Sequence, residues 1–113
     1  SMKQVADRRD LIGGETLNLV GLEFKLLHAP GHSPGCVILV AEEVALTGDV
    51  LFKGSIGRTD LPHSDHAAMQ RSLRGPVWGL DDSLAILPGH GPTTTMRRER
   101  ATNPFLRAAG DVL

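Results

Sequence analysis

Three short motifs each place a side chain that can bind a metal ion in a tight turn directly after an apolar segment. The motifs are residues 30–35 (PGHSPG), 47–49 (TGD) and 87–92 (LPGHGP). Two histidines and one carboxylate suit a hydrolytic metal such as zinc or iron, because imidazole nitrogens and carboxylate oxygens ligate both ions. His32, Asp49 and His90 are therefore candidate metal ligands.

The elements that must position these residues are strands that end just before them. Leu22, Phe24 and Leu26 alternate with charged residues, which predicts a strand with one buried face over residues 22–28. Further strands are expected over residues 16–20, 36–41, 44–47 and 83–87. Because side chains that follow strand ends meet at one edge of a sheet, we expect the three candidate ligands to converge.

Turn chemistry alone could explain each of the three residues taken singly. A histidine can cap a loop, and an aspartate after glycine can form an Asx turn. The combination favours a site, because a Pro-Gly pair precedes each histidine and glycine lies on both sides of His90. Small neighbours let the backbone bend and leave room for a metal and a substrate.

Two helices are expected in the second half of the chain. Ser64 and Asp65 offer an N-cap for a short amphipathic helix that ends near residues 75–76 (Gly-Pro). A second helix over residues 95–102 must stop near Asn103, because proline follows. We interpret its charged stretch at 97–100 (RRER) as a solvated helix face. Residues 3–13 are predicted to form a weakly structured segment before the first strand.

Composition predicts a globular protein without a nucleic-acid or membrane partner. The 113 residues are 41% hydrophobic and 22% charged, with a formal net charge of −1. We expect residues 1–113 to form one partial domain, with Ser1 and Met2 as a scar of tag removal. Cys36 is the only cysteine, which favours a reducing, cytoplasmic setting. As a small buried hydrophobic residue it needs no further role.

Together the three motifs resemble the later ligand motifs of the metallo-β-lactamase superfamily. Residues 51–62 (LFKGSIGRTDLP) and 103–106 (NPFL) are similar to its glyoxalase II-like branch, related to hydroxyacylglutathione hydrolases. The resemblance runs from about Gly14 to Leu106. It implies an α/β fold: the C-terminal half of a four-layer αββα sandwich, with mostly antiparallel strands and two or three short helices.

The resemblance also implies roles for individual residues. His32 resembles the histidine that completes a first metal site, Asp49 the catalytic carboxylate that bridges two metals, and His90 the histidine of the second site. The implied cofactor is a pair of zinc ions, with iron or manganese as substitutes. The implied reaction is attack of a metal-bound hydroxide on a small-molecule thioester. A weaker role in substrate binding is assigned to Lys53 and Arg58, although an ion pair between Arg58 and Asp60 is the favoured interpretation.

The sequence departs from the family in lacking its first ligand motif, His-x-His-x-Asp-His. We therefore expect the chain to bind metal weakly and to be inactive alone. Its apolar strands should leave a sheet face that self-associates or pairs with a missing N-terminal half. The substitute motif at 63–66 (HSDH) is better explained as a helix start, and His28 as a residue of the site's wall.

Two other functions remain open at this point. Residues 35–37 (GCV) and 57–60 (GRTD) also resemble persulfide dioxygenases of the same superfamily, which are oxidoreductases with a single iron ion. A truncated chain could alternatively survive as a non-catalytic oligomerising domain.

Overall fold

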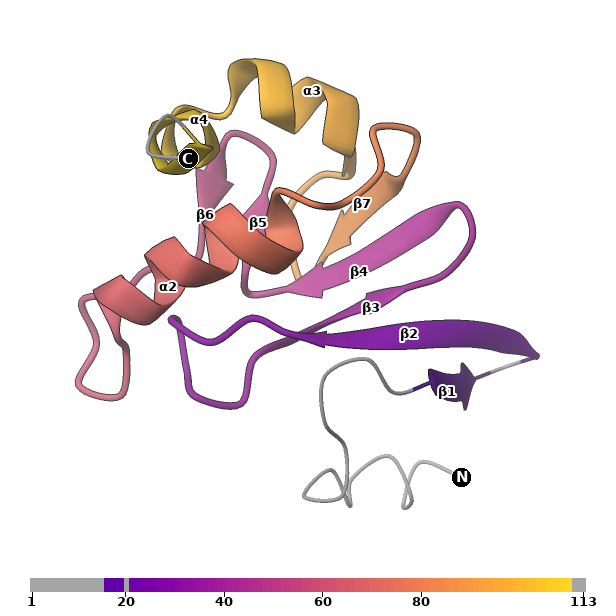
Figure 1. The fold of residues 1–113 in the computed structure, drawn as a ribbon, viewed down its shortest axis with the longest axis horizontal. Coiled ribbons are helices and arrows are strands. Elements are labelled where there is room, and N and C mark those ends of the chain that lie inside the picture. The colour runs from indigo at the N-terminus through magenta and orange to yellow at the C-terminus, as the bar shows by residue number, and fades with distance from the viewer. Residues whose placement is uncertain (1–15, 20, 111–113) are drawn as a thin grey trace.

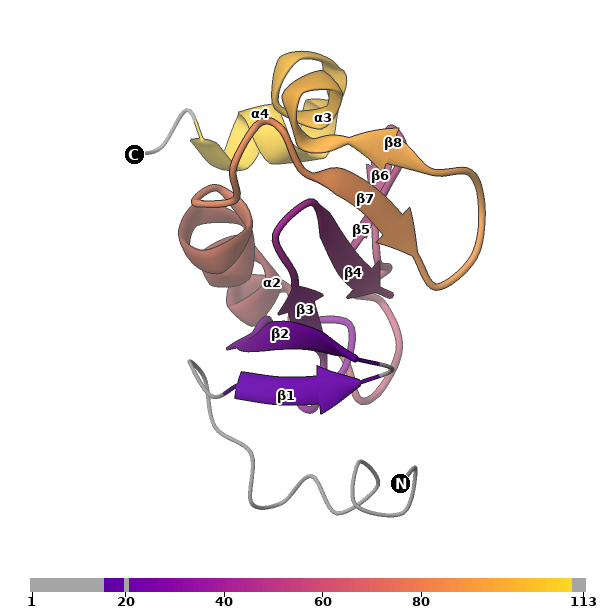
Figure 2. The same cartoon turned by 90° about the vertical axis from the view of Figure 1, so that its right-hand side faces the viewer.

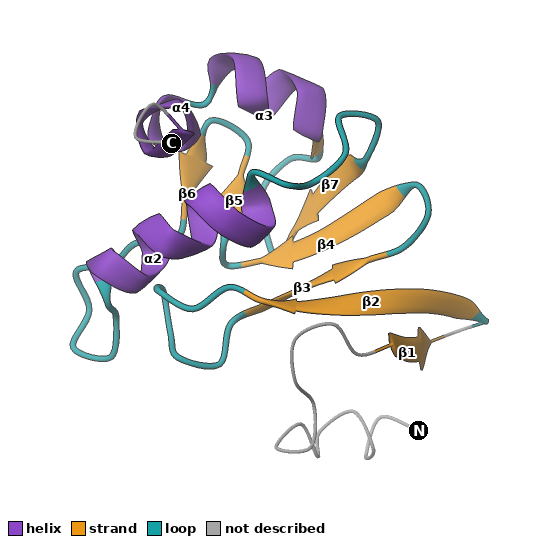
Figure 3. Cartoon of the chain, in the orientation of Figure 1, coloured by secondary structure: helices purple, strands orange, loops and turns teal. Residues whose placement is uncertain are grey.

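The described residues form a six-stranded mixed sheet, a small two-stranded sheet and helices packed along them (Figures 1 and 3). The computed structural model describes residues 16–19 and 21–110, so the expectations for residues 1–2, 3–13 and 20 lie outside the described residues. The sheet has the strand order β1-β2-β3-β4-β7-β8. Its strands are β1 (Thr16–Leu19), β2 (Leu22–His28), β3 (Val37–Val40), β4 (Val44–Gly48), β7 (Ala85–Pro88) and β8 (Thr94–Thr95). All neighbours in the sheet pair antiparallel except β4 and β7, which are parallel.

The expected strands are confirmed and pair as hairpins, and their register orients the sheet. β1 pairs with β2, with Leu17 opposite Phe24, and β3 pairs with β4 on either side of the turn at Glu42 and Glu43. β2 is antiparallel to β3, and β3 is antiparallel to β4, so β2 and β4 run in the same direction. β7 is parallel to β4 and shares that direction. The carboxyl ends of β2, β4 and β7 therefore lie at one edge of the sheet.

A second, two-stranded sheet was not expected from the sequence. β5 (Leu51–Phe52) and β6 (Ser55–Ile56) form a hairpin around Lys53 and Gly54. Gly54 has a φ of 76°, a left-handed conformation that glycine adopts without steric cost. Strands of two residues carry no periodicity, so the only available signal was the Lys-Gly turn itself.

The first expected helix is confirmed, although its last part is a π-helical turn instead of an α-helix. α2 (His66–Ser72) begins after Asp65, whose carboxylate accepts a hydrogen bond from the backbone N–H of Ala68 at 3.1 Å. The chain then continues as a π-helical turn, η2 (Leu73–Val77), which includes Pro76. A wide π turn accommodates the missing N–H of proline, and it buries Leu73 and Val77 completely.

The second expected helix is confirmed, and a further helix follows it. α3 (Met96–Thr102) is capped by Thr95 and ends at Asn103, which is extended as the residue before proline must be. α4 (Pro104–Gly110) was not predicted. The Asn103 side-chain oxygen accepts hydrogen bonds from the N–H groups of Phe105 and Leu106. Asparagine followed by proline is a helix-start signal that the sequence contained.

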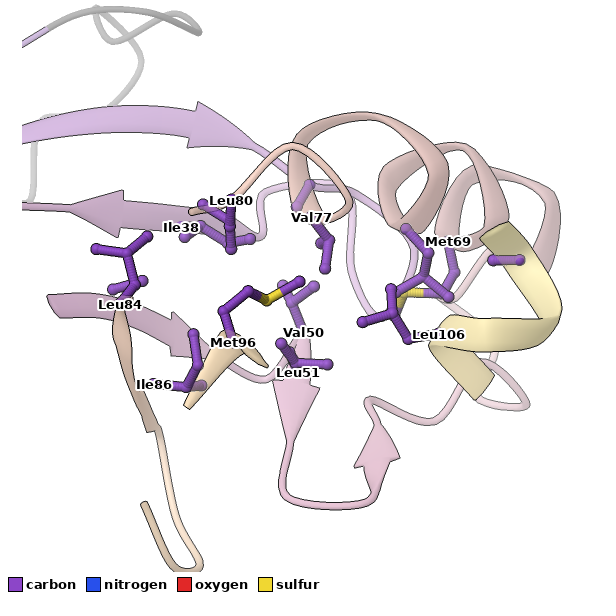
Figure 4. Close-up of a cluster of buried hydrophobic side chains, with 14 residues drawn as sticks. Ile38, Val50, Leu51, Met69, Val77, Leu80, Leu84, Ile86, Met96 and Leu106 are labelled. Carbon is purple, nitrogen blue, oxygen red and sulfur yellow. The ribbon is translucent and has the colours of Figure 1, made fainter. Parts of the chain in front are cut away.

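The helices cover one face of the main sheet and enclose the core with it (Figures 2 and 4). Ile38, Ala45 and Ile86 from the sheet are fully buried against α2, η2 and α4. The helical side of the core includes Met69, Leu73, Val77, Leu106 and Ala109. No helix in residues 16–19 and 21–110 is both long and apolar enough to span a membrane.

The opposite face of the sheet is also apolar. Register places Leu39, Leu46 and Leu87 side by side on this face, because each lies one residue from a position that faces the helices. Leu39 and Leu46 are half-buried, and Leu87 is 37% exposed. Within the described part of the chain, all the helices that enter the core pack on the other face.

Candidate metal centre

The three candidate ligands lie where β2, β4 and β7 end. His32 lies four residues after the last residue of β2, Asp49 follows β4 directly, and His90 lies two residues beyond β7. The backbone N–H of Gly89 donates to the carbonyl oxygen of Gly48 at 2.9 Å, which ties the two loops together. The sheet thus brings together residues that are 17 and 41 positions apart in the sequence.

Asp49 lies between the two histidines and presents a different oxygen to each. Its Oδ2 atom is 3.8 Å from Nε2 of His32, and its Oδ1 atom is 3.7 Å from Nδ1 of His90. The side chains of His32, Asp49 and His90 are 21%, 46% and 76% exposed, so the site opens towards His90. The expected convergence of the three residues is confirmed.

The tautomer of His32 follows from the hydrogen-bond partner of Nδ1, the ring nitrogen that does not face Asp49. Nδ1 lies 3.0 Å from the backbone carbonyl oxygen of Arg58. Because a carbonyl oxygen only accepts, the hydrogen must be on Nδ1. In the neutral ring this leaves the lone pair on Nε2, the atom that faces Asp49. A histidine oriented in this way by a backbone carbonyl is typical of metal sites.

The donor atoms fit metal ions in part. Separations of 3.7 and 3.8 Å are too long for hydrogen bonds. They are compatible with two ligands that share one ion at about 2.0–2.2 Å from each. Within the part of the chain that the structure describes, no group of three or more His, Cys, Asp or Glu side chains is placed to hold one ion. The three residues thus form two pairs that share Asp49.

A cavity of about 280 Å³ lies over the three residues. It is lined by His32, Asp49, Phe52, Ile56, Gly57, Arg58 and His90. The ring of Phe52 packs on that of His90, with 4.7 Å between centroids. Phe52 and Ile56 come from the unexpected hairpin and give the cavity an apolar wall. The resemblance over residues 51–62 included both of them, but nothing in their spacing predicted that they would line a cavity with the three candidate ligands.

Of the two residues given a weaker role, the structure brings Arg58 to the cavity and not Lys53. Lys53 is exposed in the β5–β6 turn and does not line the cavity. The guanidinium of Arg58 pairs with both carboxylate oxygens of Asp60, at 2.8 and 2.9 Å. This confirms the predicted ion pair. Hydrogen bonding between the two groups raises the pKa of Arg58 and lowers the pKa of Asp60.

We expect Asp60→Asn to lower the stability of the chain slightly at neutral pH and not at all in acid. The folded-state pKa of Asp60 is below its ordinary value of 3.8, so its stabilisation is complete above that pH. It is lost as the pH falls from 3.8 towards the lowered pKa. Urea midpoints of the two proteins, measured from pH 7 down to pH 2.5, should differ at first and then converge. A constant difference across this range would contradict the prediction.

The other singled-out residues lie outside this cavity. Asp65 caps α2, and the ring of His66 lies 3.2 Å from the hydroxyl of Thr59, which supports the helix-start interpretation of residues 63–66. His28 is exposed at the end of β2 and does not line the cavity. Cys36 is half-buried just before β3, with its sulfur 3.3 Å from the hydroxyl of Ser33.

Comparison with known proteins points to one family. Residues 3–95 match the metallo-beta-lactamase superfamily. Hydroxyacylglutathione hydrolase GloC of Haemophilus influenzae is 46% identical over 97 residues, which are 84% of this chain and 46% of GloC. The chain of the crystal structure of BLEG-1 B3 metallo-beta-lactamase has 41% sequence identity with this chain and a TM-score of 0.78. The match covers 85% of this chain and 47% of the BLEG-1 chain.

A further solved structure was determined with metal. The protein TTHA1623, in a di-iron-bound form, is 44% identical with a TM-score of 0.72. The match covers 84% of this chain and 46% of TTHA1623. The chain thus spans about half the length of the relatives that it matches. By its sequence, its mixed sheet and its helices, the chain belongs to the metallo-beta-lactamase superfamily.

Proposed function

We propose that the chain is part of a metal-dependent, glyoxalase II-like hydrolase that acts on small thioesters such as hydroxyacyl-thiols. The proposal rests on the position of Asp49, whose two oxygens face two different histidines. Such a carboxylate suits a bridge between two ions, one beside His32 and one beside His90. The likeness to a hydroxyacylglutathione hydrolase supports the substrate class, and the di-iron form of TTHA1623 supports a pair of ions.

We further propose zinc as the metal, with iron or manganese as substitutes. Bound divalent cations would supply Lewis acidity, which activates water and polarises a carbonyl group. The chain's own residues then have separate tasks. His32 and His90 would hold the cations as neutral imidazoles, and the carboxylate of Asp49 would offset part of their charge. The apolar wall of Phe52 and Ile56 is suited to the acyl chain of a small substrate.

The donors found in residues 16–19 and 21–110 are too few for two complete metal sites. A structural or catalytic zinc ion takes about four ligands, whereas two histidines and one shared carboxylate provide two for each ion. We propose that the remaining ligands come from another part of the protein, and that this part covers the apolar face with Leu39, Leu46 and Leu87. Without it, the chain is inactive, binds metal weakly and self-associates through that face. A cytoplasmic location completes the proposal, supported by the single cysteine.

The test is to express the complete reading frame beside the isolated chain. We expect the complete protein to hydrolyse hydroxyacyl thioesters, followed by the released thiol, and to contain two metal ions. The isolated chain should show no turnover under the same conditions. One iron ion, with oxygen consumed in the presence of a persulfide, would replace this proposal with the dioxygenase alternative. Absence of any turnover or bound metal in the complete protein would favour a non-catalytic domain.

A further inference from the structure

A buried carboxylate lies behind the candidate metal centre and takes no part in it. The side chain of Glu99, in α3, is fully buried. Its Oε1 atom accepts hydrogen bonds from the backbone N–H of Gly54 at 2.8 Å and from the side-chain amide of Asn103 at 3.0 Å. Its Oε2 atom accepts one from the hydroxyl of Thr94 at 2.8 Å.

This arrangement is specific because a buried carboxylate is costly unless its oxygens are satisfied. All three donors are neutral groups, and they come from three separate elements of the fold. Each bond holds its donor in place, because breaking it would leave a buried polar group without its partner. Glu99 thus joins α3, the β5–β6 hairpin and β8 at one point.

Two of these connections lead to segments that line the cavity. Gly54 lies in the turn of the hairpin that carries Phe52, and Asn103 adds hydrogen bonds to the carbonyl oxygens of Phe52 and Ser55. Thr94 begins β8, the strand into which the His90 loop leads. The rings of Phe52 and His90 meet between these two anchors, 4.7 Å apart.

We propose that Glu99 is a positioning residue that fixes the His90 loop against Phe52. It touches neither the cavity nor the three candidate ligands, and it acts through Gly54 and Thr94. The inference concerns the position of the His90 side chain relative to the Phe52 side chain. It therefore holds whichever reaction the complete protein catalyses, and its test needs neither turnover nor an occupied metal site.

The test uses Thr94→Val and Glu99→Gln in the full chain, with the ring protons of His90 as the signal. An aromatic ring 4.7 Å away shifts these protons by its ring current, and Phe52→Leu defines their position without it. We expect both variants to move the His90 signals towards those of Phe52→Leu and to weaken the cross-peaks between the two rings. Thr94→Ser should restore the wild-type signals, because it returns the hydroxyl. The methyl signals of Ile38, in the core, should stay unchanged.

Thr93→Val is the matched control, since it makes the same change one residue away at an exposed side chain. Its His90 signals should remain those of the wild type. Wild-type His90 signals in Thr94→Val would overturn the proposal. The Thr94 variants decide the matter even if Glu99→Gln does not fold.

Discussion

Replacing Asp49 by asparagine should remove nearly all of the zinc affinity of this chain. The side chain keeps its shape, but one oxygen becomes an NH₂ group that cannot ligate a metal, and the negative charge is lost. Because each oxygen of Asp49 faces a different histidine, one proposed ion position loses its ligand oxygen, and both positions lose the negative charge. We expect the affinity to fall by at least about 100-fold, beyond the 10–100-fold cost of losing an outer-shell partner. Competition with a chromophoric chelator measures it.

Asp60→Asn is the matched control for this experiment. It makes the same chemical change in the same region, but Asp60 is paired with Arg58 and faces solvent. Its zinc affinity should remain within about 3-fold of the wild type, since an exposed pair of this kind is screened by solvent. Far-ultraviolet circular dichroism should confirm that both variants fold. Equal loss of affinity in the two variants would contradict a specific role for Asp49.

The site could be predicted from the sequence because each ligand is marked locally. His32, Asp49 and His90 each follow an apolar run and sit in a turn rich in glycine or proline, and both signals are readable without tertiary contacts. The expected strands before them are confirmed to within two residues at each end. Their common direction then places all three residues at one edge.

The supporting structure behind the site could not be predicted in the same way. The stretch at 97–100 was interpreted as a solvated helix face, and this is wrong for Glu99, which is fully buried. Arg100 is also partly buried, with hydrogen bonds to the carbonyl oxygens of Trp78 and Leu80. The available signal was helical spacing, because Glu99 lies three residues after the buried Met96. Nothing local indicates which donors would satisfy its carboxylate.

The hairpin of β5 and β6 is a second feature that the sequence could not predict. Its two strands are too short for periodicity, and its position depends on the hydrogen bonds from Asn103 and to Glu99, about 45 residues later in the chain. The apolar wall of the cavity is therefore set by long-range polar contacts. A sequence pattern identifies residues that can ligate a metal, whereas the shape of the cavity around them depends on the packed fold.

Gly57 lies where this packing is tightest, and Gly57→Ala should damage both the fold and the site. A Cβ atom at this position would be 1.9 Å from the carbonyl oxygen of Asp49 and 3.1 Å from Cβ of His32. The nearer atom belongs to the backbone, so no side-chain rotation can relieve the clash. Overpacking of this kind costs about 1–3 kcal/mol, and we expect the upper end of that range.

Relief of the clash requires the backbones of residues 49 and 57 to move apart, next to the side chains of Asp49 and His32. The change should therefore lower the zinc affinity of the folded variant as well as its free energy of unfolding in urea. Gly35→Ala is the control, because a Cβ atom there meets nothing within 4 Å. It should alter stability by less than about 0.5 kcal/mol, as surface substitutions usually do. If Gly57→Ala matched this control in both measurements, the backbone around Asp49 would be more adaptable than a close-packed site allows, and the prediction would be wrong.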